Sequence, residues 1–509
     1  MNHLITWPVL VPLLAAVLLL VVPTARLRLI VSAAAALLTL GLQIAILIRV
    51  AQGEVLVAQM GSWPAPFGIS LVADGLAAIM LVLAGITGLL TVVFAGSSLQ
   101  HAPHRVLGGL LNRAREAHGA QALLQFLFMG VNMSFLTGDL FNLFVAFEVL
   151  LVASYGLLLL GGELPQLREG FRYVVVNLLS SAVFVAAAGM SYGLFGTLNM
   201  ADIAQRLATH GPDPRVTAVA ALLALAFAVK AAMFPLGFWL PNSYPVPAAA
   251  VSAFFAALLT KVGAYALIRV FTLMFPAEDG IKLILLAMAG LTLLFGALGT
   301  ITRQRWRHVL SFANVASIGY LLSGAFLGSL AGLEAALYYM VNSVLVIFAL
   351  FLIAALAEAI GGQNFRAPGH LASYPWLAGG YFLGMLTLSG MPPTSGFIGK
   401  FAIIGSLLAT GGWIAVGVAV AAVLGSLLLL YAGVEIWRAF FWGGSDAVHP
   451  VSLPRTMSSV TAISVVLLAA LALFSGPVYS LTAMVADQLG SNSAYLQAVM
   501  GGAGPEGVR

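Results

Sequence analysis

The sequence predicts an all-α, polytopic membrane protein with about fourteen transmembrane helices, which form a single transmembrane domain over residues 1–509. Two observations predict this class. Of the 509 residues, 61% are hydrophobic and only 8% are charged, whereas about a quarter of the residues in a typical soluble domain are charged. Apolar windows of about 20 residues, the length that crosses a bilayer, recur from one end of the chain to the other.

The expected spans follow one another without a soluble domain between them. The first run begins near Leu4 and has no positive residue before it, so we interpret it as a retained helix rather than a signal peptide. The fourteen expected spans cover residues 4–22, 28–48, 72–95, 121–138, 139–160, 172–196, 216–240, 246–271, 281–301, 308–328, 332–357, 376–409, 412–436 and 457–485.

The loop cations predict the orientation of the chain. Loops on one side of the expected spans contain thirteen arginines. Those on the other side contain six cations, which are Arg49, Arg206, Arg215, Arg269, Lys282 and Arg509. The richer side contains Arg26, Arg28, Arg105, Arg113, Arg115, Arg168, Arg172, Arg303, Arg305, Arg307, Arg366, Arg438 and Arg455. Cytoplasmic loops carry the excess of Lys and Arg, so this side is expected to be cytoplasmic and both termini to lie outside. The net charge of +5 is then a consequence of topology and predicts no nucleic-acid partner.

The residue content also excludes several kinds of site. The chain has no cysteine, which excludes disulfides, thiolate metal sites and thiol catalysis. We find no phosphate-binding loop, dinucleotide fingerprint, metal-ligand cluster or nucleophile constellation. No cofactor and no metal site are therefore predicted.

Three of the four lysines are placed unlike the other cations. Lys230, Lys261 and Lys400 lie well inside apolar segments, while the eighteen arginines fall in loops or near span ends. A charge at mid-bilayer costs about 3 kcal/mol or more and usually has a function. Lysine loses its proton readily when desolvated and arginine does not, so this segregation indicates proton transfer. The alternative is snorkelling to the interface, which fits Lys230 poorly because it lies near the middle of its span.

Glu148 is the candidate partner for these lysines. It lies nine residues beyond Asp139 in "NLFVAFEVLLVASYGLLLL", or roughly 13 Å along a helix, and so near mid-depth. A carboxyl group alone there stays protonated, but beside a lysine it ionises. The alternative is a neutral, hydrogen-bonded glutamic acid in a packed core.

Prolines interrupt two of the lysine-bearing spans. Pro235 follows Lys230 and frees the carbonyl of Ala231, and Pro392 and Pro393 precede Lys400. Free carbonyls in a membrane are tolerated where they line a cavity or meet water. Such paired interruptions are typical of transporters built from inverted repeats, so we expect repeats over 121–271 and 281–440 with broken seventh and twelfth helices. The alternative is a packing kink without a function.

Several motifs resemble one known family. The stretches "TGDLFNLFVAFEVLLVASYGLLLLGG", "VKAAMFPLGFWLP", "VSAFFAALLTKVGAYALIR" and "SGMPPTSGFIGKF" resemble the antiporter-like membrane subunits. That family includes the large proton-pumping subunits of respiratory complex I and the A and D subunits of the Mrp-type monovalent cation/proton antiporters. The resemblance covers nearly the whole chain, is greatest to the D subunits, and implies the same number of spans.

The resemblance implies a role for each buried ionisable residue. Glu148 resembles the glutamate of the fifth span that pairs with the lysine of the seventh, and Lys230 resembles that lysine. Lys261 resembles the connecting lysine of the eighth span, and Lys400 the terminal lysine of the broken twelfth. Together they imply a lateral proton relay at mid-membrane.

This chain departs from its relatives between Lys261 and Lys400. Ser317 stands where many relatives have histidine in the tenth span, and Tyr339, Ser343 and Ile347 stand where relatives often have histidines and a lysine in the eleventh. The middle of the relay must then depend on water and on other polar side chains. The candidates are Ser311, Asn314, Ser317, Tyr338 and Asn342.

These observations lead to one predicted function and two alternatives. We expect the proton-translocating subunit of an antiporter that exchanges Na⁺ or another monovalent cation for H⁺ across a bacterial cell membrane. The resemblance implies partner subunits of the A, B, C, E, F and G kinds. One alternative is a proton-pumping membrane subunit of complex I or of a membrane-bound hydrogenase. The other is a membrane scaffold whose charges have no function.

Overall fold

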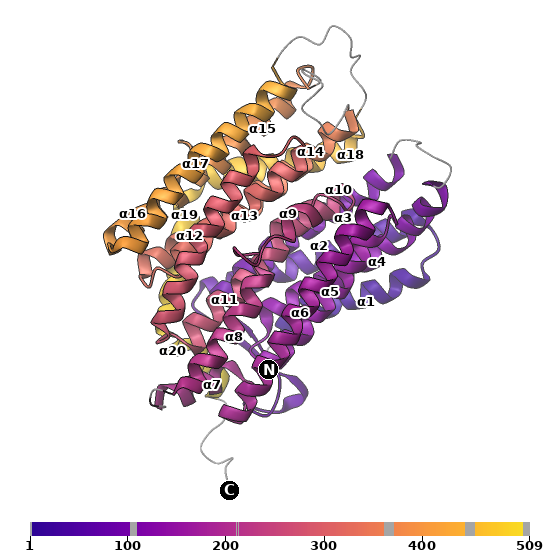
Figure 1. Ribbon diagram of the computed structural model, residues 1–509. Coiled ribbons are helices and arrows are strands. Elements are labelled where there is room, and N and C mark those ends of the chain that lie inside the picture. The colour runs from indigo at the N-terminus through magenta and orange to yellow at the C-terminus, as the bar shows by residue number, and fades with distance from the viewer. Residues whose placement is uncertain are drawn as a thin grey trace.

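The computed structural model describes residues 3–101, 109–209, 211, 213–360, 371–442 and 453–501. Within these ranges the chain is a bundle of roughly aligned helices (Figure 1). The helices from the N-terminal part of the sequence lie on one side of the bundle, those from the C-terminal part lie on the other side, and helices from the middle of the sequence lie between them. Eleven of the described helices are long and apolar enough to cross a membrane. Among the cations used to predict orientation, Arg105, Arg366 and Arg509 lie outside the described residues.

Most expected spans correspond to one helix each. These helices are α1 (Trp7–Val21), α2 (Ala25–Ala51), α3 (Gly75–His101), α4 (Gly109–Leu136), α5 (Leu140–Leu159), α6 (Leu164–Phe195), α12 (Asp279–Ile301), α13 (Trp306–Ala325), α14 (Leu330–Ile360), α17 (Trp413–Phe440) and α18 (Arg455–Leu473). The boundary between the fourth and fifth spans is made by Asp139, whose carboxylate accepts a hydrogen bond from the Asn142 amide at 2.8 Å. That bond caps the start of α5.

Both expected helix interruptions are present in the structure. The seventh span is α8 (Pro214–Lys230), which ends at the lysine itself and is followed by the short α9 (Leu240–Ser243). The twelfth span is α15 (Pro375–Ser389) and α16 (Ser395–Thr410). Gly390 ends α15 with a φ of 79°, a left-handed conformation that glycine adopts at little cost.

The eighth span is irregular in a way that the sequence did not predict. It consists of α10 (Ala249–Phe254), the π-helical turn η3 (Phe255–Leu259), α11 (Thr260–Arg269) and a second π-helical turn η4 (Val270–Met274). Its apolar window is entirely buried within the protein. The helix that bears Lys261 is thus a central element, with a change of hydrogen-bond register on each side of α11.

Short elements at one end of the bundle were also not predicted. The strands β1 (Leu56–Gln59) and β2 (Ser70–Ala73) form an antiparallel pair, and α7 (Met200–Thr209) lies in the polar stretch 197–215. The 3₁₀ turns are η1 (His3–Thr6) and η2 (Met60–Ser62).

The last expected span, 457–485, is wrong in its extent: α18 ends at Leu473 and separate helices follow, α19 (Ser475–Ser491) and α20 (Ser493–Met500). Pro477 lacks the N–H that would continue the hydrogen bonding of α18.

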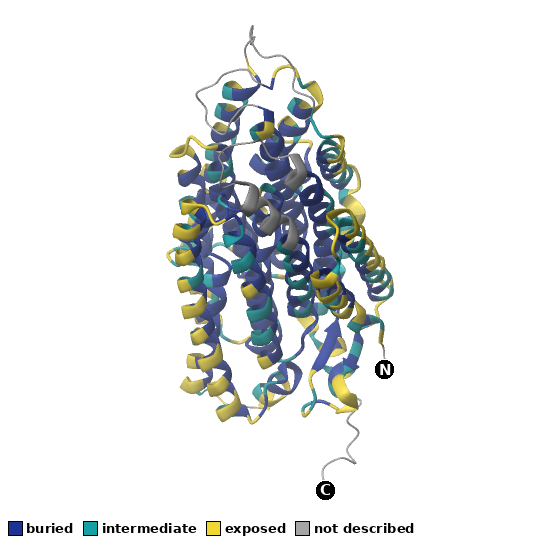
Figure 2. Cartoon of the chain, turned by 90° about the vertical axis from the view of Figure 1, so that its right-hand side faces the viewer, coloured by how far each residue is buried: buried dark blue, intermediate teal, exposed yellow. Residues whose placement is uncertain are grey.

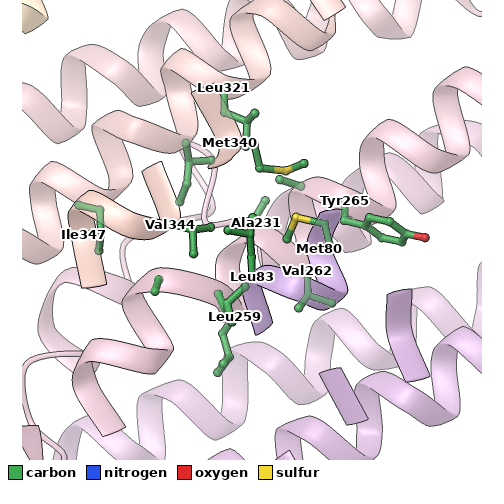
Figure 3. Packing of buried hydrophobic residues seen from close by; sticks show 14 of the residues in the cluster. Met80, Leu83, Ala231, Leu259, Val262, Tyr265, Leu321, Met340, Val344 and Ile347 are labelled. Carbon is green, nitrogen blue, oxygen red and sulfur yellow. The ribbon is translucent and has the colours of Figure 1, made fainter. Parts of the chain in front are cut away.

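The core lies between the two groups of helices. Dark blue, buried residues fill the centre and yellow, exposed residues lie along the outer helices (Figure 2). The buried apolar side chains of α3, α11 and α14 meet in this core (Figure 3). The side chains labelled there from these three helices are Met80, Leu83, Val262, Tyr265, Met340, Val344 and Ile347.

Helices α12 and α13 approach closely enough for backbone contact. A Cβ atom on Gly319 would lie 2.7 Å from the carbonyl oxygen of Ala289, and one on Gly296 would lie 2.7 Å from Cα of Ala316. Small residues at such positions let membrane helices pack tightly. This packing fixes α13, whose polar face meets Lys261.

We predict that Gly319→Ala destabilises the protein, because the added methyl group meets backbone that has little room to move. Overpacking of this kind costs about 1–3 kcal/mol. The matched control is Gly417→Ala, since a Cβ there meets nothing within 4 Å and alanine favours a helix by about 1 kcal/mol. Thermal unfolding of the purified protein measures both variants, and equal melting temperatures would contradict the expected difference.

Candidate functional site

Lys230 lies at the broken end of α8 and is held by a hydroxyl and an aromatic ring. Its side chain is buried, and Nζ donates a hydrogen bond to Oγ of Ser181 on α6 at 3.2 Å. Nζ also lies 5.0 Å from the centroid of the Phe147 ring on α5, within the range of a cation–π interaction. The carbonyl of Val229, at the end of α8, accepts from the amide of Ala232 at 3.0 Å and also from the indole of Trp239 at 3.2 Å.

Glu148 follows Phe147 on α5 and is not ion-paired with Lys230. No ion pair of 4.0 Å or less joins the two residues among those formed by the described part of the chain. Oε1 of Glu148 is buried and has no hydrogen-bond partner within that part. The direct pairing of Glu148 with Lys230 therefore stays a prediction.

Lys261 is fully buried on α11 and contacts one of the expected path residues. Nζ donates to Oδ1 of Asn314 on α13 at 2.6 Å and to the carbonyl of Ala256 at 3.2 Å. Ala256 belongs to the π turn η3, where the shift to i→i+5 bonding changes which carbonyls the helix itself uses. The structure thus brings Lys261 and Asn314 together although they are far apart in the sequence.

Gly263 brings the helix of Lys261 against the end of the helix that bears Lys230. A Cβ atom on Gly263 would lie 2.5 Å from the amide nitrogen of Ala231 and 2.7 Å from the carbonyl carbon of Lys230. Only a residue without a side chain permits this approach. The first two lysines are therefore carried by backbones in direct contact.

Lys400 folds back over the break between α15 and α16. Nζ donates to the carbonyl of Leu388 at 2.7 Å and to Oγ of Ser426 on α17 at 3.2 Å. It also lies 4.0 Å from the centroid of the Tyr320 ring. The carbonyl of Leu388 is one that Pro392 removes from helical bonding, so the break supplies an acceptor for the lysine.

Two hydrogen-bonded hydroxyl pairs, joined to each other only by a contact of aromatic rings, lie between Ser317 on α13 and Lys400. Tyr339 donates to Oγ of Ser317 at 3.4 Å, and its ring packs against that of Tyr320 with centroids 5.6 Å apart. The hydroxyls of Tyr320 and Ser426 lie 2.7 Å apart. Ser426 in turn accepts the bond from Lys400 described above.

The other expected path residues are not all joined to these hydroxyl groups. Ser311 donates to the carbonyl of Arg307 in its own helix at 2.8 Å. Asn342 accepts a bond from Ser395, just beyond the helix break, at 2.8 Å. Within the described residues, Nδ2 of Asn314, Nδ2 of Asn342 and the hydroxyl of Tyr338 are buried without a hydrogen-bond partner. The amide of Asn314 therefore does not bond to Ser317, although the two are three positions apart on one helix face.

Sequence reasoning missed several residues of this site. Ser181, Ser426 and Tyr320 contact the lysines or each other but were not candidates. A single serine within the apolar run of α17 was the available signal for Ser426. Arg269, which was counted with the loop cations near the end of the expected span 246–271, is 2% exposed and pairs with Asp74 inside the bundle. The loop pattern did not predict this burial or this partner.

Comparison with known proteins identifies the family. Residues 137–425 match the family described as NADH:quinone oxidoreductase/Mrp antiporter, TM. Over 508 residues the chain is 36% identical to the D subunit of the Na(+)/H(+) antiporter of Alkalihalophilus pseudofirmus, with 98% of this chain and 100% of that protein covered. This chain belongs to the family of Mrp antiporter D subunits. The family is one of transporter subunits, and its members are not enzymes.

Further relatives agree in sequence and fold with this membership of the D-subunit family. The D subunit of the Na(+)/H(+) antiporter of Bacillus subtilis (strain 168) is 37% identical over 447 residues, which cover 87% of this chain and 88% of that protein. A chain in the structure of the Mrp complex from Dietzia sp. DQ12-45-1b has a TM-score of 0.87 and 28% identity, with 98% of this chain and 100% of that chain covered. The fold is therefore that of the Mrp and complex I antiporter-like subunits.

We predict that Gly390→Ala destabilises the protein more than Gly196→Ala does. Both glycines end helices in the left-handed region, with φ of 79° and 67°, so both substitutions cost about 1–2 kcal/mol of backbone strain. A Cβ on Gly390 would in addition lie 2.7 Å from Cδ of Lys400, whereas one on Gly196 meets its nearest atom at 3.7 Å. Thermal unfolding of the two variants measures the difference, and equal losses would contradict the expected clash with the side chain of Lys400.

Proposed function

We propose that this chain translocates protons within a multi-subunit antiporter that exchanges Na⁺, or another monovalent cation, for H⁺. One observation carries the proposal: Lys230, Lys261 and Lys400 are buried and are held by neutral groups. Among the ion pairs of the described residues, none includes these three lysines. A buried lysine that is held by hydroxyl, amide and carbonyl oxygens, with no carboxylate fixed against it, loses its proton more readily than one locked in an ion pair.

The order of the groups along the bundle supports a lateral relay from Glu148 to Lys400. Closing the Glu148–Lys230 pair would hold the proton on Lys230, and opening the pair would favour its transfer toward Lys261. The backbone contact at Gly263 keeps these two helices together. Beyond Lys261, Asn314 is the next polar group. Water between Asn314 and Ser317, and again between the hydroxyls of Tyr339 and Tyr320, would complete the path to Ser426.

We also propose that the chain crosses the membrane fourteen times, with inverted repeats over 121–271 and 281–440. The eleven candidate spans leave out α13 and the two broken helices, each of which would supply one crossing. An even number of crossings puts both termini on one side, which the loop cations indicate is outside. The contacts of η1 and α20 with β1 at one end of the bundle support this topology.

The partners that we propose are the other subunits of the Mrp complex, of the A, B, C, E, F and G kinds, in a bacterial cell membrane. The structural relative from Dietzia comes from such a complex. The apolar outer faces of α2, α6 and α17 are open to lipid or to these subunits. Exposed apolar residues on these faces include Leu37, Leu179, Tyr192, Val420 and Leu427.

The proposal predicts that Lys230→Ala and Glu148→Ala abolish Na⁺-dependent proton exchange while the complex still assembles. Loss of one proton-transfer group lowers a rate by about a hundredfold or more. The measurement is the collapse of ΔpH on adding Na⁺ to everted vesicles from a host without other antiporters, with the whole set of subunits expressed. Copurification of a tagged partner protein of the complex reports assembly.

The fourth lysine of the chain provides the matched control. Lys282 pairs with the exposed Asp279 at 2.7 Å near the start of α12, so Lys282→Ala should leave exchange unchanged. Exchange that persists in an assembled Lys230→Ala complex would rule out the relay. Vesicles that contain the assembled wild-type complex but ignore Na⁺ would contradict the antiporter proposal.

The proposed topology predicts opposite accessibility for two exposed glutamines. Because the chain contains no cysteine, a single introduced cysteine is a unique label site. Gln52→Cys, after α2, should react with an impermeant maleimide in intact cells. Gln304→Cys, after α12, should react only in everted vesicles. The reverse pattern would mean that the termini are cytoplasmic.

A further inference from the structure

The helix that carries Lys261 ends in a buried ion pair. Arg269, the last residue of α11, donates from Nη1 and Nη2 to the two carboxylate oxygens of Asp74 at 2.6 Å each. The side chains are 2% and 6% exposed. The ionisable groups that face Arg269 are Asp74, Tyr265 and Tyr495, so this end of α11 is tied to the start of α3 and to the C-terminal α20.

Each residue of this pair is fixed by its own neighbours. Asp74 immediately precedes α3 and accepts a hydrogen bond from the amide of Ala77 at 3.1 Å. Tyr265 lies one turn before Arg269, and its hydroxyl donates to the carbonyl of Phe135 at the end of α4 at 2.6 Å. The guanidinium lies 5.2 Å from the ring centroid of Tyr495. The rotation of α11 about its axis is therefore set from its last turn.

The other end of the eighth span is held by a second ion pair. Arg307, at the start of α13, forms a bidentate pair with Glu358 of α14. Its Nη1 donates to the carbonyls of Pro245 and Pro247 at 2.9 and 3.0 Å and to Oγ of Ser252 in α10 at 3.4 Å. This contact fixes the chain just before α10.

The π turns divide the span between these two ends. The turn η3 separates α10 from Lys261, and η4 follows Arg269. Lys261 and Arg269 therefore share one uninterrupted α-helix of ten residues, so that a rotation of α11 moves both side chains together. A shift of one residue in a helical register rotates the helix by about 100°, which would turn Lys261 away from Asn314.

We propose that Asp74 and Arg269 are a positioning pair that fixes the rotation of α11 and so directs Lys261 toward Asn314. The proposal rests on the proposed function, in which Lys261 carries a proton. A buried ion pair adds little stability compared with apolar side chains of similar size, so stability alone does not explain why two charges are retained here. Arg307 and Glu358 hold the segment on the other side of η3 against this rotation.

The first test replaces both charges at once, so that neither is left buried and unpaired. The variant Asp74→Asn with Arg269→Gln, the anchor variant, retains groups that form hydrogen bonds. Its matched control is Glu54→Gln with Arg49→Gln, which neutralises an ion pair of 2.6 Å whose side chains are 40% and 44% exposed. We expect the anchor variant to assemble. Its Na⁺-dependent proton flux should fall to roughly a tenth of the wild-type flux, a change typical of residues that act through another group. The control should retain its flux.

A double-mutant cycle separates positioning from a general structural role. Asn314→Leu removes the side-chain acceptor of Lys261. If the pair acts by directing Lys261 to Asn314, the anchor variant should cause no further loss in the Asn314→Leu background. The same tenfold loss in both backgrounds would overturn the proposal, because the pair would then act independently of this contact.

A structure of the assembled anchor variant decides the proposal without reference to transport. We expect the contact between Nζ of Lys261 and Oδ1 of Asn314 to be lost in a cryo-EM map, and its retention would overturn the proposal. If Lys261→Ala complexes still exchange ions, the relay is wrong while this geometric test still stands. Should the double variant fail to assemble, Arg269→Lys keeps the charge but not the bidentate bond, and the same contact is examined there.

Discussion

The need of three buried ammonium groups for oxygen acceptors governs much of this structure. An unsatisfied charge in a membrane interior is costly, and regular helices have few free carbonyls to offer. The break before α16 supplies the carbonyl of Leu388 to Lys400, and the π turn before α11 supplies that of Ala256 to Lys261. Lys230 lies at a third irregularity, the end of α8, and uses Ser181 and the Phe147 ring instead. The backbone irregularities and the lysines are therefore parts of one arrangement.

Arginine and lysine have separate tasks inside the bundle. Arg269 and Arg307 form bidentate pairs with carboxylates and hold several segments in place. The buried lysines have neutral partners. Arginine stays charged under all ordinary conditions, whereas lysine loses its proton when desolvated. Permanent charges thus suit fixed contacts, and the groups that can lose a proton are held by neutral oxygen atoms and aromatic rings.

Most of the fold followed from the apolar pattern and from the prolines. The number and order of long apolar segments predicted a helical membrane bundle, because only helices and closed barrels satisfy the backbone in lipid. Pro235, Pro392 and Pro393 indicated where helices are interrupted. The π turns around α11 were not predictable in this way, since nothing in "FAALLTKVGAYALIRVFTLM" removes a backbone donor. Their register depends on how this buried segment packs against α3, α8 and α14.

The sequence by itself determined which residues are chemically unusual: three lysines and one glutamate within apolar spans. It did so because a charge within an apolar run is visible without knowing any contact. Only the tertiary structure decided what each of them touches. Asn314 meets Lys261, Ser426 meets Lys400, and Arg269 meets Asp74 from a distant part of the chain. These partners are ordinary polar residues whose role depends on the packing of distant helices, and a local pattern does not specify that packing.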